Sequence, residues 1–279
     1  MKSILILIAL SISATQLFSQ RVELQLSAGQ GFSKGGSPLS SYDESQSGDL
    51  VNNLITTIQN RDDTYFSIGQ GSRGAAQANL YLSDNLGIFT ALSYSAGSQT
   101  SKVNNSYPGF LTIETTSDNT SIKYSSGSIQ AGLQFQSQEG LFEPFAGIGA
   151  GYFFPITLTT TEDYSGTHTE TQSKTNAPIG YISYVGINLR ISPNVAFFIS
   201  ARATIVTYYI TRTEITDYSY NGVSQLSSRT TNELVTVYDE NKDYTTSSAN
   251  DANLPRNGGP PIPAPASTLA IMGGFSFKL

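Results

Sequence analysis

Hydrophobic and polar residues alternate along much of this chain, and the alternation is clearest in its last stretch, residues 266–279. Leu269, Ile271, Gly273, Phe275, Phe277 and Leu279 fall on one parity, and Thr268, Ala270, Met272, Gly274, Ser276 and Lys278 fall on the other. Successive side chains of a β-strand point to opposite faces, so a period of two predicts a strand. One face of this terminal strand is apolar and ends in aromatic residues.

Seven earlier segments show the same period and are also predicted to be strands. They are residues 21–31, 66–82, 88–97, 122–137, 141–158, 177–191 and 195–211. In residues 122–137, Ile129 and Leu133 share one face, while Gln130 and Gln134 share the other. In residues 141–158, three glycines fall on the inner parity, where they would leave room for bulky side chains from other strands of a small barrel. These glycines are Gly147, Gly149 and Gly151.

The connections between the predicted strands alternate between short and long. Short turns are expected at residues 83–87, 138–140 and 192–194, and long polar loops at 32–65, 98–121, 159–175 and 212–264. Outer-membrane barrels place short turns on the periplasmic side and long loops outside the cell. The sequence therefore predicts an all-β fold, an eight-stranded antiparallel up-and-down transmembrane β-barrel. A ten-stranded barrel remains open, if residues 212–264 add a membrane hairpin.

Two of the long loops contain candidate elements of their own. Residues 49–60 carry Leu50, Leu54 and Ile58 at helical spacing, which predicts a short amphipathic helix packed against the barrel rim. Residues 234–238 are apolar and β-branched enough to form a strand of a protruding hairpin.

The first 20 residues have the pattern of a secretory signal peptide. Lys2 supplies the positive charge, and residues 4–12 form an apolar run that is well short of the roughly 20 residues a spanning helix needs. We therefore expect residues 21–279 to form one outer-membrane β-barrel domain, located in the cell outer membrane of a Gram-negative bacterium.

The amino-acid composition excludes some kinds of chemistry and some classes of partner. The chain has no cysteine, which excludes disulfides, thiolate metal sites and a lipoprotein anchor. Its net charge of −6, which becomes about −7 without Lys2, argues against nucleic acid as a partner. The expected surroundings are outer-membrane lipid and lipopolysaccharide.

The stretch 144–152, PFAGIGAGY, the rhythm of strands and turns, and the aromatic C-terminal strand resemble the small OmpA/OmpX-type outer-membrane β-barrel superfamily. The resemblance implies a porin-like barrel that the barrel-assembly machinery inserts by reading the terminal strand. Two features depart from that pattern. Leu279 replaces the usual terminal phenylalanine, and no peptidoglycan-binding domain is recognisable, so tethering to the cell wall is not expected.

Few charged residues fall on the inward parity of the predicted strands. They are Glu23, Glu143, Arg190, Arg202 and Lys278. Glu23 and Lys278 lie on the two strands that close the barrel, and Glu143 and Arg190 lie on another neighbouring pair. We predict these two ion pairs near the periplasmic end, with Arg202 higher in the lumen. Because eight strands leave a lumen just wide enough for side chains, this lumen charge cluster should act as an internal plug.

Signals for catalysis or cofactor binding are weak. His168 is the only histidine, and its loop neighbours Glu162, Asp163 and Ser165 are residues that any polar loop offers. A lone histidine with scattered carboxylates is a poor metal site, and it also disfavours a lipid-modifying enzyme. The glycine-rich run at 147–151 lacks the Gly-Lys-Ser/Thr ending of a phosphate loop. We predict no catalytic, cofactor or metal site.

The functional expectation is accordingly a non-enzymatic protein with a filled lumen that serves envelope structure, or binding and adhesion through its loops. Several tyrosines gather near the last loop, either as an interfacial girdle or as a surface for an extracellular ligand or envelope protein. They are Tyr208, Tyr209, Tyr218, Tyr220, Tyr238 and Tyr244. The alternative is a narrow channel for small solutes, for which the inner glycines of residues 141–158 are the only indication.

Overall fold

The computed structural model describes residues 21–32, 37–38, 58–61, 65–66, 68–108, 113–137, 140–164, 166–239 and 253–279. The predicted signal peptide, residues 1–20, and residues 49–57 of the predicted amphipathic helix lie outside these ranges.

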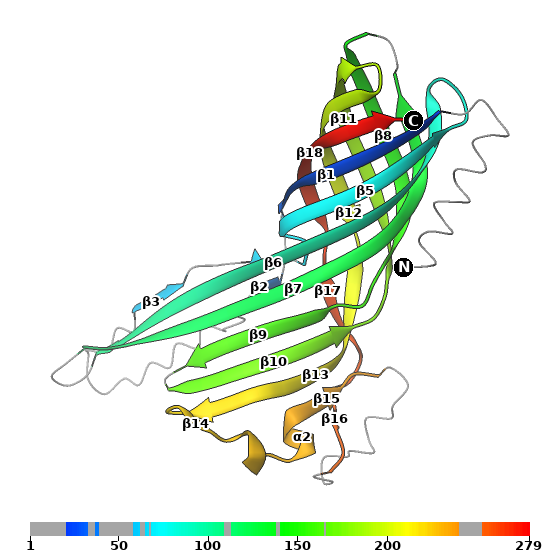
Figure 1. Ribbon diagram of the computed structural model, residues 1–279. Coiled ribbons are helices and arrows are strands. Elements are labelled where there is room, and N and C mark those ends of the chain that lie inside the picture. The colour runs from blue at the N-terminus through cyan, green and yellow to red at the C-terminus, as the bar shows by residue number, and fades with distance from the viewer. Residues whose placement is uncertain are drawn as a thin grey trace.

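Eight strands form a closed ring. They are β1 (Val22–Phe32), β5 (Gly71–Tyr81), β6 (Leu86–Pro108), β7 (Ile113–Gln136), β8 (Phe142–Phe153), β11 (Ile179–Ser192), β12 (Val195–Ile205) and β18 (Thr268–Lys278). Each pairs with the next in antiparallel fashion, and β18 closes on β1 in a register from Glu23 opposite Lys278 to Phe32 opposite Leu269 (Figure 1). The all-β, eight-stranded antiparallel barrel is confirmed. None of the described residues of 212–264 enters the ring, so the ten-stranded alternative is wrong.

The alternation read from the sequence determines which side chains point outward. In β18, Leu269, Ile271 and Phe275 are exposed, whereas Ala270 and Met272 are buried. The other seven ring strands also expose apolar side chains, among them Leu26, Ile129, Ile148, Val185 and Ile199. Such a continuous apolar exterior on a closed barrel is stable in lipid, since every backbone group is paired within the ring. The chain is therefore an outer-membrane-type β-barrel.

No helix among the described residues is long and apolar enough to cross a membrane.

Further strands extend the sheet beyond the end of the ring that lies opposite the short turns. They are β9 (Thr157–Tyr164), β10 (Thr167–Thr175), β13 (Thr207–Tyr220), β14 (Val223–Ser224), β15 (Val235–Val237), β16 (Arg256–Asn257) and β17 (Ile262–Pro265), with η1 (Leu226–Ser228) and α2 (Thr231–Leu234) between them. The outer halves of β6 and β7 pair through to Pro108 opposite Ile113, β9 pairs with β7, and β13 pairs with β10. We use the name projecting sheet for the part of the sheet that extends past the apolar exterior of the ring. It is formed by the outer halves of β6 and β7 with β9, β10 and β13, and it extends to the lower left in Figure 1.

The projecting sheet differs from the loops expected at residues 98–121 and 159–175, because both segments form β-hairpins. They are rich in Ser and Thr, and Thr favours strands. Both faces of these strands are polar, so the period of two is absent from their sequence. The predicted strand at 234–238 is confirmed at residues 235–237, which form β15 and pair with β13, whereas Leu234 ends α2.

Two predicted strands are interrupted at the outer rim. Residues 141–158 divide into β8 and β9 around Pro155, and residues 195–211 divide into β12 and β13 at Val206. Proline cannot donate a ladder hydrogen bond, which accounts for the break at residues 154–156. Phe153 and Ile156 are both buried, so the inward parity changes across that break.

The segment 32–65 contributes short strands in its described part. β2 (Ser37–Pro38) pairs with β4 (Tyr65–Phe66), and β3 (Ile58–Arg61) pairs with the outer part of β6, with Ile58 opposite Ser106. The helix expected over residues 49–60 is therefore wrong at residues 58–60. The long free edge of β6 offers backbone partners that fix this segment in an extended conformation.

Candidate functional site in the barrel lumen

One side of the lumen is aromatic. Tyr184 of β11 makes edge contacts with Phe89 and Phe145, at ring-centroid distances of 5.3 and 6.1 Å. The glycines of β8 face these rings: a Cβ at Gly147 would collide with the Tyr184 ring, and one at Gly149 would lie 2.9 Å from Phe89 Cζ. The prediction that inner glycines make room for bulky side chains is confirmed.

The other side of the lumen holds a network of hydrogen-bonded amide and hydroxyl side chains. Arg202 Nη2 donates to Gln77 Oε1 at 2.8 Å, and Gln77 Nε2 donates to Tyr184 Oη at 2.9 Å and to Gln134 Oε1 at 3.0 Å. Gln134 Nε2 donates to Tyr81 Oη at 2.7 Å. These residues come from four strands of the ring, so together they fill the middle of the lumen.

The network continues to the end of the ring that carries the short turns, where two carboxylates are fully buried. We call this the periplasmic end, because outer-membrane barrels place their short turns on that side. Tyr81 donates to Gln136, and Gln136 Nε2 donates to Glu143 Oε2 at 3.1 Å. Glu143 also accepts from Arg190 and, at 3.1 and 3.2 Å, from Lys278 Nζ. The predicted pair of Glu143 and Arg190 is therefore present in the structure.

Glu23 has different partners from the one predicted. It accepts from Ser276 Oγ at 2.5 Å, from Gln25 Nε2 at 3.0 Å and from Arg21 Nη2 at 3.2 Å. Lys278 lies opposite Glu23 in the register, yet its ammonium extends to Glu143. The predicted Glu23–Lys278 pair is wrong because Arg21 and two neutral donors already satisfy Glu23.

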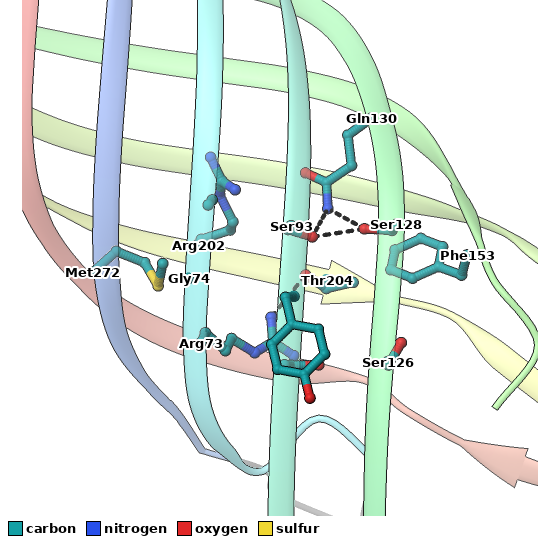
Figure 2. Close-up of a pocket in the computed structure, with 13 residues that line it drawn as sticks. Arg73, Gly74, Ser93, Ser126, Ser128, Gln130, Phe153, Arg202, Thr204 and Met272 are labelled. Atoms are coloured by element: carbon teal, nitrogen blue, oxygen red, sulfur yellow. Dashed lines mark hydrogen bonds between the residues drawn. The ribbon is translucent and has the colours of Figure 1, made fainter. Parts of the chain in front are cut away.

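The outer half of the lumen contains two arginines. Arg202 is buried where the sequence placed it, above the charged end. Arg73, which sequence analysis missed, donates to Thr268 Oγ1 at 2.5 Å, Thr204 Oγ1 at 3.4 Å and the Gly69 carbonyl at 3.3 Å. Arg73 falls on the same parity as the inward-facing Gln77 and Tyr81, which is the signal that could have identified it. Both arginines line a cavity (Figure 2).

An apolar cluster lies at the outer rim of the ring. It is the outer part of one buried cluster that also includes Phe89, Phe145 and Tyr184. Its residues at the rim are Ile68, Tyr124, Phe153, Ile156, Leu158, Val206 and Tyr208. Tyr208, expected among the surface tyrosines, is only 1% exposed, and its hydroxyl lies 2.7 Å from Ser126 Oγ. The continuation of β12 into β13 keeps even-numbered residues inward here, which buries Tyr208 and exposes Tyr209.

His168 lies on β10 of the projecting sheet, in a strand where a loop was expected. Its Nδ1 is 2.6 Å from Asp163 Oδ1 on β9, and both side chains are substantially exposed. The hydrogen bond to Asp163 raises the pKa of His168 above its ordinary value. Within the described ranges no group of three or more His, Cys, Asp or Glu residues could hold a metal ion.

No protein-family model matches the sequence, and no curated protein matches it. Among solved structures, the crystal structure of the outer membrane protein OprG from Pseudomonas aeruginosa is similar over 93% of this chain and 95% of that chain. The sequence identity is 12% and the TM-score is 0.39.

Proposed function

We propose that this protein is a non-enzymatic outer-membrane barrel of a Gram-negative bacterium, with a plugged lumen and a projecting sheet that binds partners at the cell surface. We also infer membership of the small OmpA/OmpX-type superfamily, since eight strands are joined by short turns on one side only. The observation that carries the proposal is the network that crosses the lumen from Arg202 to Lys278.

The network supports a closed lumen because its members leave little room for solvent. Glu23, Asn79, Gln134, Glu143 and Asn188 are each 0% exposed. An eight-stranded ring is just wide enough for side chains to fill, and here polar side chains and aromatic rings fill it from opposite sides. Ions would have to break several buried hydrogen bonds to pass.

The projecting sheet supports a binding role. Its exposed tyrosines, Tyr164, Tyr209 and Tyr220, stand among Ser and Thr side chains. Tyrosine gives a large contact area at low entropic cost, and hydroxyl residues add adaptable hydrogen bonds. An extracellular ligand or envelope protein is the expected partner, with lipopolysaccharide around the belt and the barrel-assembly machinery acting during insertion.

Single-channel recording from the refolded protein in planar bilayers tests the closed lumen. We expect a silent wild type. Glu143→Ala and Arg190→Ala should open measurable conductance, because Glu143 accepts the last hydrogen bond of the row that holds Gln134 across the lumen. Glu214→Ala, in the projecting sheet and paired with Arg212, is the matched control and should stay silent.

A steady wild-type current would contradict the closed lumen and favour a narrow channel for small solutes. One observation favours that second function, namely the polar cavity in the outer half of the lumen. Such a channel would still have to open the layer of Gln77, Tyr184 and Gln134 below the cavity.

A further inference from the structure

A cavity in the outer half of the lumen brings side chains of opposite character together. Arg73 of β5 and Arg202 of β12 line one side, and Ser93 of β6 with Ser128 and Gln130 of β7 line the other. Figure 2 shows the serine and glutamine cluster to the right of the two arginines. The cavity is thus bounded by two fixed positive charges and by hydroxyl and amide groups.

Neither arginine has a carboxylate partner among the described residues. In the same ranges, carboxylates pair with Arg21, Arg190, Arg212, Arg229 and Lys278. The partners of Arg73 are two hydroxyls and a carbonyl. The guanidinium of Arg202 donates to the amide oxygen of Gln77 and lies 5.0 Å from the centroid of the Tyr184 ring, so its partners are neutral as well. Two uncompensated charges inside a barrel are costly, and an anion placed between them would offset that cost.

Two buried polar atoms of the cavity residues have no hydrogen-bond partner in the described part of the chain. They are Nε of Arg202, a residue that is 8% exposed, and Oε1 of Gln130, a residue that is 3% exposed. The amide of Gln130 is held in place, since its Nε2 donates to both Ser93 Oγ and Ser128 Oγ at 2.8 Å. The site therefore presents an unused donor and an unused acceptor on fixed side chains.

We propose that this cavity binds a small phosphate-type oxyanion between Arg73 and Arg202. Guanidinium groups bind oxyanions through paired, charge-assisted hydrogen bonds. Ser93 and Ser128 share one hydrogen bond at 2.6 Å, so one hydroxyl proton of the pair is left as a further donor. The Gln130 oxygen can accept the proton of a hydrogen phosphate, whereas sulfate has no proton to offer near neutral pH. The site thus prefers phosphate to sulfate, and it goes beyond the surface role proposed above without depending on it.

The ligand could be free phosphate or the phosphate of a lipid headgroup, which share this chemistry. Isothermal titration of the refolded full barrel in a phosphate-free, non-ionic detergent separates them. Inorganic phosphate is one titrant, a short-chain phosphatidate is the second, and sulfate is the third. Saturable binding of inorganic phosphate identifies the free anion; binding of phosphatidate alone identifies the lipid headgroup.

The variants Arg73→Gln and Arg202→Gln each remove one charge from the cavity. Each should weaken phosphate binding about tenfold or more, because hydrogen bonds to charged groups are among the strongest. Arg212→Gln is the matched control, since it removes the same charge from the projecting sheet. It should bind phosphate as the wild type does.

Absence of saturable binding of either phosphate compound to the wild type would overturn the proposal. Equal weakening by Arg212→Gln would also overturn it, because binding would then follow net charge alone. If an arginine variant fails to refold, Ser128→Ala keeps the charge and should still weaken binding several-fold. Binding to Ser128→Ala with wild-type affinity and no preference over sulfate would place the anion elsewhere.

Discussion

The two ends of the lumen handle buried charge differently. At the periplasmic end, Glu143 forms ion pairs with Arg190 and Lys278, and Glu23 forms one with Arg21, so each buried carboxylate has a cationic partner. At the outer end, Arg73 and Arg202 are held by neutral groups only. The difference teaches that the inner end is complete within the chain, whereas the outer end has a net charge that another species can balance.

The largest expected loss of stability comes from removing a charge at the periplasmic end, where every buried carboxylate is paired. Glu143→Ala leaves Arg190 and Lys278 without their common carboxylate. Loss of one partner from a buried ion pair typically costs about 3–5 kcal/mol, so we expect a destabilisation of about 3 kcal/mol, as Arg190 is partly exposed. Urea unfolding from lipid vesicles, followed by circular dichroism because the chain lacks tryptophan, measures it. Glu162→Ala on the exposed face of β9 should change the unfolding free energy little.

A second variant tests the packed middle that separates the two ends. In Gly147→Ala the new Cβ meets the ring of Tyr184, and we expect overpacking to cost about 1–3 kcal/mol. Gly273→Ala is the matched control, because the nearest heavy atom to its Cβ lies 3.7 Å away. Similar unfolding free energies for the two variants would mean that Tyr184 and its neighbours can shift to accommodate the added methyl group at little cost.

The outer end should lose less stability than the periplasmic end when one buried charge is removed. In phosphate-free buffer, Arg202→Met removes an uncompensated buried charge while keeping an apolar stem, so its stability should lie within about 1 kcal/mol of wild type. Lys278→Met, at the complete end, should cost more because Glu143 loses a partner. If Arg202→Met proves the more damaging of the two in urea unfolding, the contrast between the ends fails.

The smallest effect lies outside the lumen, at His168. Its pKa is raised by Asp163, so the folded state holds the proton more tightly than the unfolded chain. The contribution of the pair is complete below the unfolded pKa of about 6.5 and is lost as the pH rises through the higher folded pKa. Since His168 is the only histidine, its imidazole resonance can be titrated by NMR without assignment. Asp163→Asn should return the pKa toward its ordinary value.

The ring was predictable from sequence because lipid and lumen impose opposite demands on alternate residues. Leu133 and Gln134 are neighbours in β7, yet one must face hydrocarbon and the other the buried network. The hairpins at residues 98–121 and 159–175 could not be recognised in this way, because their residues are mostly polar at both parities. Local backbone pairing forms them, and that leaves no period in the sequence.

The lumen was predictable only in part, for reasons of side-chain reach. Parity placed Glu143 and Arg190 together, and they are paired. Parity could not show that the flexible Lys278 passes over its register neighbour to reach Glu143. Arg73 was missed because its neighbours Gly71, Ser72, Gly74 and Ala75 do not alternate. The inward direction at Arg73 has to be extended from Gln77 and Tyr81 further along the same strand.

One row of hydrogen bonds in the plug has a single direction. From Arg202 through Gln77, Gln134, Tyr81 and Gln136, each side chain donates toward the periplasm, and the last acceptor is Glu143. Aligned bonds polarise one another, so such a row behaves as a single dipole. We therefore expect that a negative charge bound beside Arg202 would weaken the polarisation of this row as far as Glu143, at the opposite end of the lumen.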